Sequence, residues 1–279
     1  MLNKTPRPVK LIPAPIRAAS GAVWATLALL AAPCVLQADT LTDSSSQAVT
    51  LVELYTSQGC SSCPPADAFL QDLSDREDVL ALSFHVDYWN NDGWADPFSQ
   101  PSFSFRQQAY REEMGLDYVY TPQMVVAGTF AAPGGQREAI LKAISDNEGL
   151  WTASRPSLIL NRVVNDRIRV ALSNSSSISG AALYAAVYQS DQITRVRGGE
   201  NRGRTLRNVN IVKRLVRLTP NITGDLELLV PLADLDASSA DGIAVFVQRD
   251  RIGPVVAAVA LPPRPGTGMQ VSLNSVDQD

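Results

Sequence analysis

The chain is short of the residues that most reactive and metal-binding sites use, since its 279 residues include only three cysteines and one histidine. The chain also has little excess of one charge over the other. The formal net charge is -4 at pH 7, which is too mild to indicate a nucleic-acid partner. A content of 45% hydrophobic and 19% charged residues is typical of a globular protein, and the length suits two domains.

Residues 1–38 have the pattern of a secretory signal peptide. The basic residues of this segment are Lys4, Arg7, Lys10 and Arg17. An apolar run over 21–32 follows, and Ala38 offers a small residue for cleavage. The run is short for a membrane-spanning helix, which needs roughly 20 residues, although an uncleaved anchor remains the alternative. We therefore expect a periplasmic or secreted protein, without stable membrane insertion after cleavage, that loses Cys34 and keeps two cysteines.

Two textures divide the rest of the chain. From 48 to 150, strand-like and helix-like patterns alternate in the order β-α-β-α-β-β-α, which predicts an α/β domain with a largely parallel sheet. The expected strands are 49–55, 79–86, 123–127 and one beginning at 129–131, and the expected helices begin at 64 and cover 103–114 and 136–147. From 155 to 263, alternating apolar and polar residues predict a mainly antiparallel, sandwich-like β domain. A flexible tail is expected over 264–279.

The pair Cys60 and Cys63, separated by two serines, lies between an expected strand and an expected helix. A helix N-terminus favours a thiolate at Cys60, and Cys63 is placed to resolve a mixed disulfide formed there. The pattern thus indicates a redox-active disulfide. The alternative is an inert local disulfide, but so short a loop gives little chain-entropy stabilisation. A structural zinc site is disfavoured, because it normally needs four cysteine or histidine ligands.

His85 is the only histidine and ends the second expected strand, at the edge where open α/β sheets place their sites. Asp87 would share its face if the strand continued. One interpretation is that His85 tunes the Cys60 thiolate or relays a proton while Asp87 orients it. The other is a hydrogen-bonded core histidine.

Several motifs resemble known families. The Cys-x-x-Cys motif after the first strand, with Thr121-Pro122 leading into a later strand, resembles the thioredoxin superfamily. This resemblance implies a thioredoxin-like fold, a cis peptide bond before Pro122, and a role for Pro122 and Thr121 in presenting substrate. The chain departs from thioredoxin in lacking a tryptophan before Cys60 and in having Ser-Ser between the cysteines.

A closer resemblance is to a secreted bacterial family called domain of unknown function 1223. It is carried by segments in both halves of the chain, at 53–67, 85–89, 120–126 and 198–206. The family's name supplies no reaction.

Three hypotheses of function follow. The first is a thiol–disulfide oxidoreductase that acts on a protein or a small thiol or disulfide and needs no organic cofactor. The second is a copper-binding protein or metallochaperone that uses Cys60, Cys63 and His85, since thiolate and imidazole suit Cu(I). The third is an inert adaptor whose β domain does the binding.

Two further segments carry expectations. The aromatic loop over 87–101 is expected to pack onto the domain, with a lid or substrate groove as the alternative. The basic segment over 195–217 is interpreted as a solvated, salt-bridged face rather than an anion site. Within it, residues 201–203 are candidates for contact with the first domain.

Overall fold

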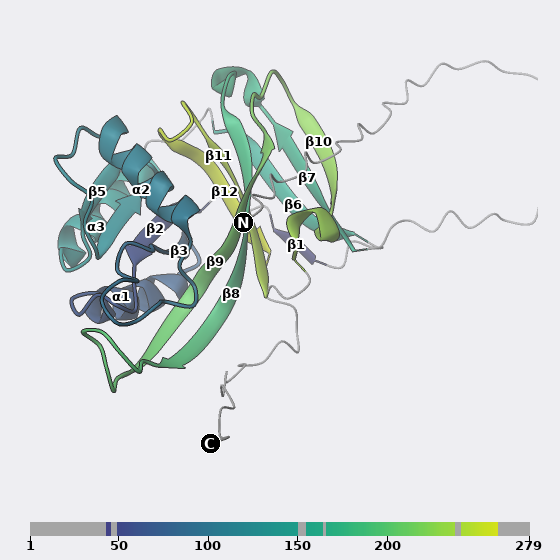
Figure 1. The fold of residues 1–279 in the computed structure, drawn as a ribbon. Coiled ribbons are helices and arrows are strands. Elements are labelled where there is room, and N and C mark those ends of the chain that lie inside the picture. The colour runs from purple at the N-terminus through teal and green to yellow at the C-terminus, as the bar shows by residue number, and fades with distance from the viewer. Residues whose placement is uncertain (1–42, 46–48, 150–154, 164–165, 238–240, 262–279) are drawn as a thin grey trace, which may run out of the picture.

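The computed structural model describes residues 43–45, 49–149, 155–163, 166–237 and 241–261. The predicted signal peptide and the predicted tail lie outside the described residues. The described chain forms two β-sheets, with three α-helices packed beside one end of the larger sheet (Figure 1).

The first half of the chain follows the predicted order of elements. These are β2 (Thr50–Thr56), α1 (Pro64–Ser74), β3 (Val79–His85), α2 (Pro101–Glu113), β4 (Gln123–Val126), β5 (Phe130–Pro133) and α3 (Arg137–Gly149). Pro64 and Pro65 begin α1, where a proline costs no hydrogen bond and its fixed φ suits the helix. Every residue of β2 and β3 is buried, which explains why both strands are continuous apolar runs in the sequence.

The other elements are almost entirely strands. They are β1 (Asp43–Ser45), β6 (Ser157–Val163), β7 (Arg167–Ser173), β8 (Ala182–Arg195), β9 (Thr205–Thr219), β10 (Leu226–Pro231), β11 (Gly242–Gln248) and β12 (Val255–Leu261), with short 3₁₀ helices at Ser175–Ile178 and Leu232–Leu235. Four of them form an antiparallel sheet in the order β1-β6-β7-β10.

The larger sheet has the order β12-β11-β8-β9-β3-β2-β4-β5. Only β2 with β3, and β3 with β9, are parallel. The expectation of a largely parallel sheet is therefore wrong. The long connection through α2 brings the chain back on the far side of β2, so that β4 runs antiparallel to it.

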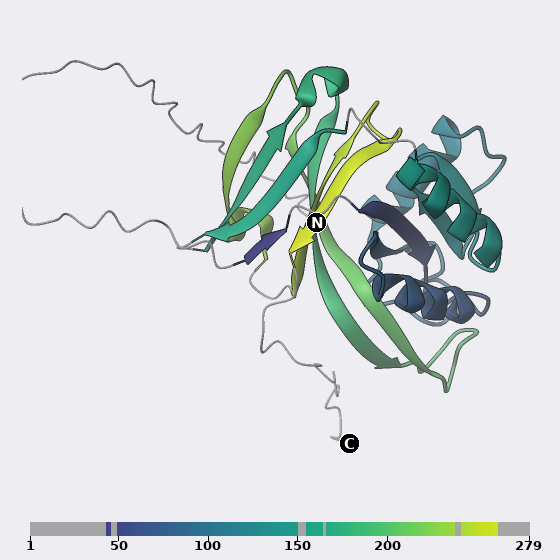
Figure 2. The same cartoon turned by 180° about the vertical axis from the view of Figure 1, so that it is seen from behind.

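Strands from both halves of the chain share this sheet, because Ser83 of β3 pairs with Ile211 of β9. The change of texture near residue 155 thus marks a change of strand pattern and not a break in the sheet. Strands β8 and β9 are the longest, with 14 and 15 residues. Their hairpin reaches past the sheet toward α1, as both views show (Figures 1 and 2).

Three apolar cores hold these layers together. One lies between the four-stranded sheet and strands β8, β11 and β12. A second lies under α2 and joins β2 and β3 to β11 and β12, and a third lies under α1 and α3. Burial of this apolar surface is the main source of stability.

A buried ion pair joins α2 to the sheet within the second core. Arg106 donates to both carboxylate oxygens of Glu53, at 2.7 and 3.0 Å, and to Gln248 of β11 at 3.0 Å. Tyr110 and Tyr55 also donate to Glu53. The pair is almost fully enclosed, so its charges depend on each other and on these neighbours.

Candidate functional site

The two cysteines form a disulfide in the turn between β2 and α1. Cys63 is the N-cap residue of α1, and its carbonyl accepts the amide protons of Ala66 and Asp67. Cys60 lies three residues before this N-cap, in a turn closed by the Cys63 N–H on the Cys60 carbonyl at 3.2 Å. Both cysteines are buried, with 1% and 0% of their surface exposed, while Ser61 and Ser62 between them are exposed.

The peptide bond between Thr121 and Pro122 is cis, as predicted. Pro122 immediately precedes β4, and its carbonyl accepts the N–H of Gly134 at 3.0 Å. A Cβ atom on Gly134 would overlap the Cβ of Ala66 and would lie 3.3 Å from that of Pro122. Glycine is therefore needed here, because Gly134, which is bonded to Pro122, also lies against Ala66 in the first turn of α1.

The aromatic loop between β3 and α2 packs onto the same region. Trp89 donates its indole N–H to the Thr121 hydroxyl at 2.8 Å, and its Cβ would lie 3.1 Å from a Cβ on Gly59. Trp94 donates to the side chain of Gln58 at 3.2 Å. These contacts support the expectation that the loop packs down onto the domain.

His85 is fully buried at the end of β3, and its partner is Asp96. The His85 Nδ1 and the Asp96 Oδ2 are 2.7 Å apart, and the same oxygen accepts the N–H of Gln58 at 2.8 Å. Burial raises the pKa of Asp96, but the charge and hydrogen bond of His85, with the N–H groups of Gln58 and Phe98, leave this pKa below its usual value. The second nitrogen of His85 has no hydrogen-bond partner among the described residues.

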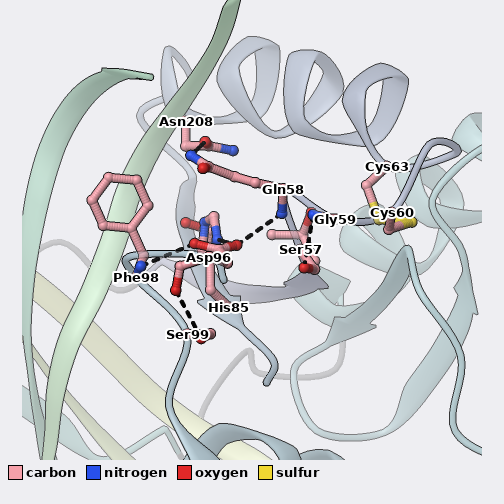
Figure 3. Close-up of polar contacts among 12 residues, drawn as sticks. Ser57, Gln58, Gly59, Cys60, Cys63, His85, Asp96, Phe98, Ser99 and Asn208 are labelled. Carbon is pink, nitrogen blue, oxygen red and sulfur yellow. Dashed lines mark hydrogen bonds and ion pairs between the residues drawn. A yellow bond between two sulfur atoms is a disulfide. The ribbon is translucent and has the colours of Figure 1, made fainter. Parts of the chain in front are cut away.

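The expectation that Asp87 orients His85 is wrong. Strand β3 ends at His85, so the alternation of faces stops there, and Asp87 instead accepts a hydrogen bond from Ser104 of α2. His85 does not reach the sulfur atoms either. Figure 3 places His85 and Asp96 beside Gln58, with the disulfide further along the chain past Gly59. The link from His85 to the dithiol segment therefore passes through Asp96 and the Gln58 backbone.

Asp67 is a further buried acid at this site. It lies four residues after Cys63, on the same face of α1, and accepts a hydrogen bond from the Thr56 hydroxyl at 2.8 Å. Burial raises its pKa to about 6, although the charge of His85 and the Thr56 bond act in the opposite direction. The sequence analysis missed Asp67 and Asp96. Asp67 could have been found from the sequence, because this acidic residue falls on the apolar face of the expected helix together with Leu70.

The hairpin between β8 and β9 completes the site from the other half of the chain. Asn201 donates to the carbonyl oxygens of Gln58 and Cys60, which confirms the expected contact of this segment with the first half. In the basic segment, Arg207 binds Asp191 through two bonds of 2.9 and 3.0 Å, in line with a salt-bridged face. Asn208 accepts a bond from Gln58 at 3.0 Å.

No group of three or more His, Cys, Asp or Glu side chains within the described ranges is arranged to hold a metal ion. The Cys60, Cys63 and His85 set of the copper hypothesis is not brought together, since His85 faces Asp96 and the cysteines are joined to each other. None of the helices in the described part of the chain is long and apolar enough to cross a membrane.

Comparisons with solved structures extend over most of the chain. No curated protein matches the chain. The crystal structure of protein AGR_C_4864 from Agrobacterium tumefaciens is similar to it, with 27% identity, a TM-score of 0.65, and coverage of 77% of this chain and 95% of that one. HBP35 of Porphyromonas gingivalis is similar in fold alone, with 13% identity, a TM-score of 0.52, and coverage of 84% and 80%.

The match to a family model spans both halves of the chain, from within β2 to the end of β11. It covers residues 51–248 and includes the disulfide, the cis-proline and the β8–β9 hairpin. The chain therefore belongs to the family described as "Protein of unknown function (DUF1223)".

Proposed function

We propose that this protein is an exported thiol–disulfide oxidoreductase whose first half has a thioredoxin-like fold. The observation that carries the proposal is the Cys60–Cys63 disulfide at the N-terminus of α1, with the first turn of α1 and the cis-Pro122 both lying against Gly134. The element order β2-α1-β3-α2-β4-β5-α3 and the strand order β3-β2-β4-β5 support the fold assignment. Export is proposed from the signal-peptide pattern of residues 1–38, and would place the disulfide in an oxidising compartment.

The exchange reaction needs two steps. In the reduced protein the Cys60 thiolate attacks a substrate disulfide, which forms a mixed disulfide on Cys60 and releases one substrate thiolate. Cys63 then loses its proton, attacks the Cys60 sulfur and releases the second substrate thiolate. Two electrons pass to the substrate and the Cys60–Cys63 disulfide forms again. A substrate dithiol drives the same steps in reverse.

The surroundings of the pair suit this chemistry. The macrodipole of α1 favours a thiolate at the segment that precedes the helix. Thr121 and Pro122 form the neighbouring surface, and Trp89 fixes the Thr121 side chain by a hydrogen bond. Substrate backbone presented at this surface would lie beside the disulfide, which is the role that we assign to Thr121 and Pro122.

The test is the midpoint potential of the pair. A Cys34→Ser background leaves Cys60 and Cys63 as the only thiols, and the protein is equilibrated against glutathione and dithiothreitol buffers before the thiols are trapped and counted by mass. We expect a two-electron midpoint between about -270 and -120 mV, the range of known exchange proteins. A pair that stays oxidised across all buffers would overturn the proposal and leave a structural disulfide.

Single-cysteine variants separate the two roles. Cys63→Ser should retain attack by Cys60 and accumulate a stable mixed disulfide with a model disulfide substrate, seen as a mass increase. Cys60→Ser should form none at the same pH. Equal trapping by both variants would contradict the assignment of Cys60 as the attacking sulfur.

A further inference from the structure

The end of the β8–β9 hairpin lies directly on the dithiol segment. We call residues 196–204 the β8–β9 tip. Its central side chain, Asn201, is 0% exposed and donates to the carbonyl oxygens of Gln58 at 3.0 Å and Cys60 at 2.8 Å. The Asn201 oxygen accepts from Arg204 of the same tip at 2.8 Å. Asn201 therefore acts as a latch in which both ends of the amide are bonded.

The tip also places a carboxylate at the start of α1. Glu200 accepts the backbone N–H of Ser61, the residue next to Cys60, at 2.9 Å. Hydrogen bonds from the Ser61 side chain and backbone lower the pKa of Glu200. Glu200 thus places a negative charge at the same N-terminus that would otherwise favour a Cys60 thiolate.

Glycines fit the tip closely against the aromatic loop. A Cβ on Gly198 would overlap the carbonyl oxygen of Gly93, and one on Gly199 would lie 3.2 Å from the Asp92 oxygen and 3.2 Å from the Trp94 Cβ. Trp94 in turn bonds Gln58. The tip is held between the dithiol segment and this loop, but by short polar contacts and glycine backbone rather than by large apolar side chains.

The disulfide is closed to solvent under this arrangement, with Cys60 1% and Cys63 0% exposed. Attack on or by a sulfur needs an open approach to that atom, which the folded arrangement does not offer. Movement of the tip would uncover the backbone of residues 58–61. It would break the bonds of Asn201 and Glu200 with that segment and separate Gly198 and Gly199 from the aromatic loop.

We propose that the β8–β9 tip is a gate over the disulfide, with Asn201 as its latch and Glu200 as the group that couples the gate to the redox state. The gate rests on the proposed oxidoreductase function and adds control of access to it. Reduction adds two electrons and two protons to the disulfide. Loss of the Cys60 proton then creates a negative charge on the residue next to Ser61, whose N–H is bonded to Glu200, and two like charges in one segment repel. The gate should therefore open more readily in the dithiol form.

The first experiment measures access without any exchange partner. A water-soluble phosphine reduces the oxidised protein, yielding two thiols and a phosphine oxide whose oxygen comes from water, and released thiol is followed over time. Asn201→Ala removes two hydrogen bonds of the closed state, so we expect reduction roughly tenfold faster. Glu200→Gln keeps the acceptor and loses the charge, and should give a smaller increase of about twofold.

Matched controls separate gating from general loosening. Asn210→Gly removes a side-chain bond from β9 to the Ala81 carbonyl, away from the cysteines, and glycine tolerates the positive φ of that position. Glu138→Gln removes a surface carboxylate from the first turn of α3. Neither control should change the reduction rate by more than about twofold. Melting temperatures of all four variants show whether the fold is intact.

The second measurement tests the coupling itself. Hydrogen exchange of the Ser61 amide should be slow in the oxidised wild-type protein, faster in the reduced form, and fast in both forms of Asn201→Ala. Equal Ser61 protection in both redox states of the wild type would overturn the redox coupling. Reduction rates of Asn201→Ala equal to wild type, in a variant that melts as wild type does, would overturn the gate.

These outcomes are independent of the proposed function. A protein without a midpoint in the range of exchange proteins would still report gating through the phosphine rates. A protein with such a midpoint but no effect of Asn201→Ala would be an oxidoreductase without a gate.

Discussion

Asp67→Asn is the substitution for which the structure predicts the clearest change of stability with pH. The pKa of Asp67 rises from 3.8 to about 6 on folding, with burial as the main cause. Because this pKa is higher in the folded protein than in the unfolded chain, the folded protein holds the Asp67 proton to a higher pH. The contribution of Asp67 to stability is therefore greatest below about pH 4 and is lost as pH rises to about 6. The shift of about two units corresponds to roughly 3 kcal/mol that the wild type loses at pH 7.

Asparagine keeps the shape and the oxygen that accepts from Thr56, but it has no charge to bury. We therefore expect the free energy of unfolding of Asp67→Asn to exceed that of the wild type by up to about 3 kcal/mol at pH 7.5. At pH 4 the two proteins should have nearly the same free energy of unfolding. Denaturant unfolding of the oxidised protein at both pH values measures this difference. A constant difference between the two proteins across pH 4–7.5 would refute the assignment of a raised pKa to Asp67.

Two further predictions concern the buried Glu53–Arg106 ion pair and the close packing at Gly134. Glu53→Gln leaves the buried Arg106 without its charge partner and should lower the free energy of unfolding by roughly 3–5 kcal/mol, whereas adding Arg106→Met should recover part of the loss in denaturant unfolding. An equal or larger loss in the double variant would contradict this. Gly134→Ala forces an overlap with Ala66, so it should lower the free energy of unfolding by about 1–3 kcal/mol and shift the redox midpoint. The control Gly135→Ala has no neighbour within 4 Å and should change neither quantity.

The local features of the fold could be predicted from the sequence. The helix over Pro64–Ser74, the strands on either side of it and the cis bond before Pro122 follow from nearby residues or from a motif. Strand direction could not be predicted in the same way. The return of β4 antiparallel to β2 depends on how the long connection through α2 packs, and no residue within β4 encodes it.

The bonded partners within the site could be predicted only where they are close in sequence. The dithiol is local, but the partner of His85 is eleven residues away in an irregular loop, at Asp96, and not at the nearby Asp87. Contact of residues 201–203 with the first half was expected, but not that Asn201 bonds the Cys60 carbonyl, 141 residues away. Such contacts depend on the hairpin of β8 and β9 folding over α1, which a periodic pattern in one strand does not encode.

The buried polar cluster around Glu53 and Arg106 is fully bonded, whereas the cluster around Asp67 and His85, behind the disulfide, is not. Glu53 and Arg106 bond each other directly, and both carboxylate oxygens of Glu53 have partners, so the two side chains are satisfied as a structural pair. Asp67 is buried with a pKa of about 6, and the second nitrogen of His85 has no partner within the described ranges.

A fold alone would favour apolar side chains at the positions of Asp67 and His85, since buried polar groups that are incompletely paired cost stability. Both positions lie just behind the segment that carries Cys60 and Cys63: one is a helical turn from Cys63, and the other is linked through Asp96 to Gln58. Destabilising groups gathered behind the disulfide are what the proposed oxidoreductase function predicts, because strained or incompletely paired groups cluster at sites of chemistry.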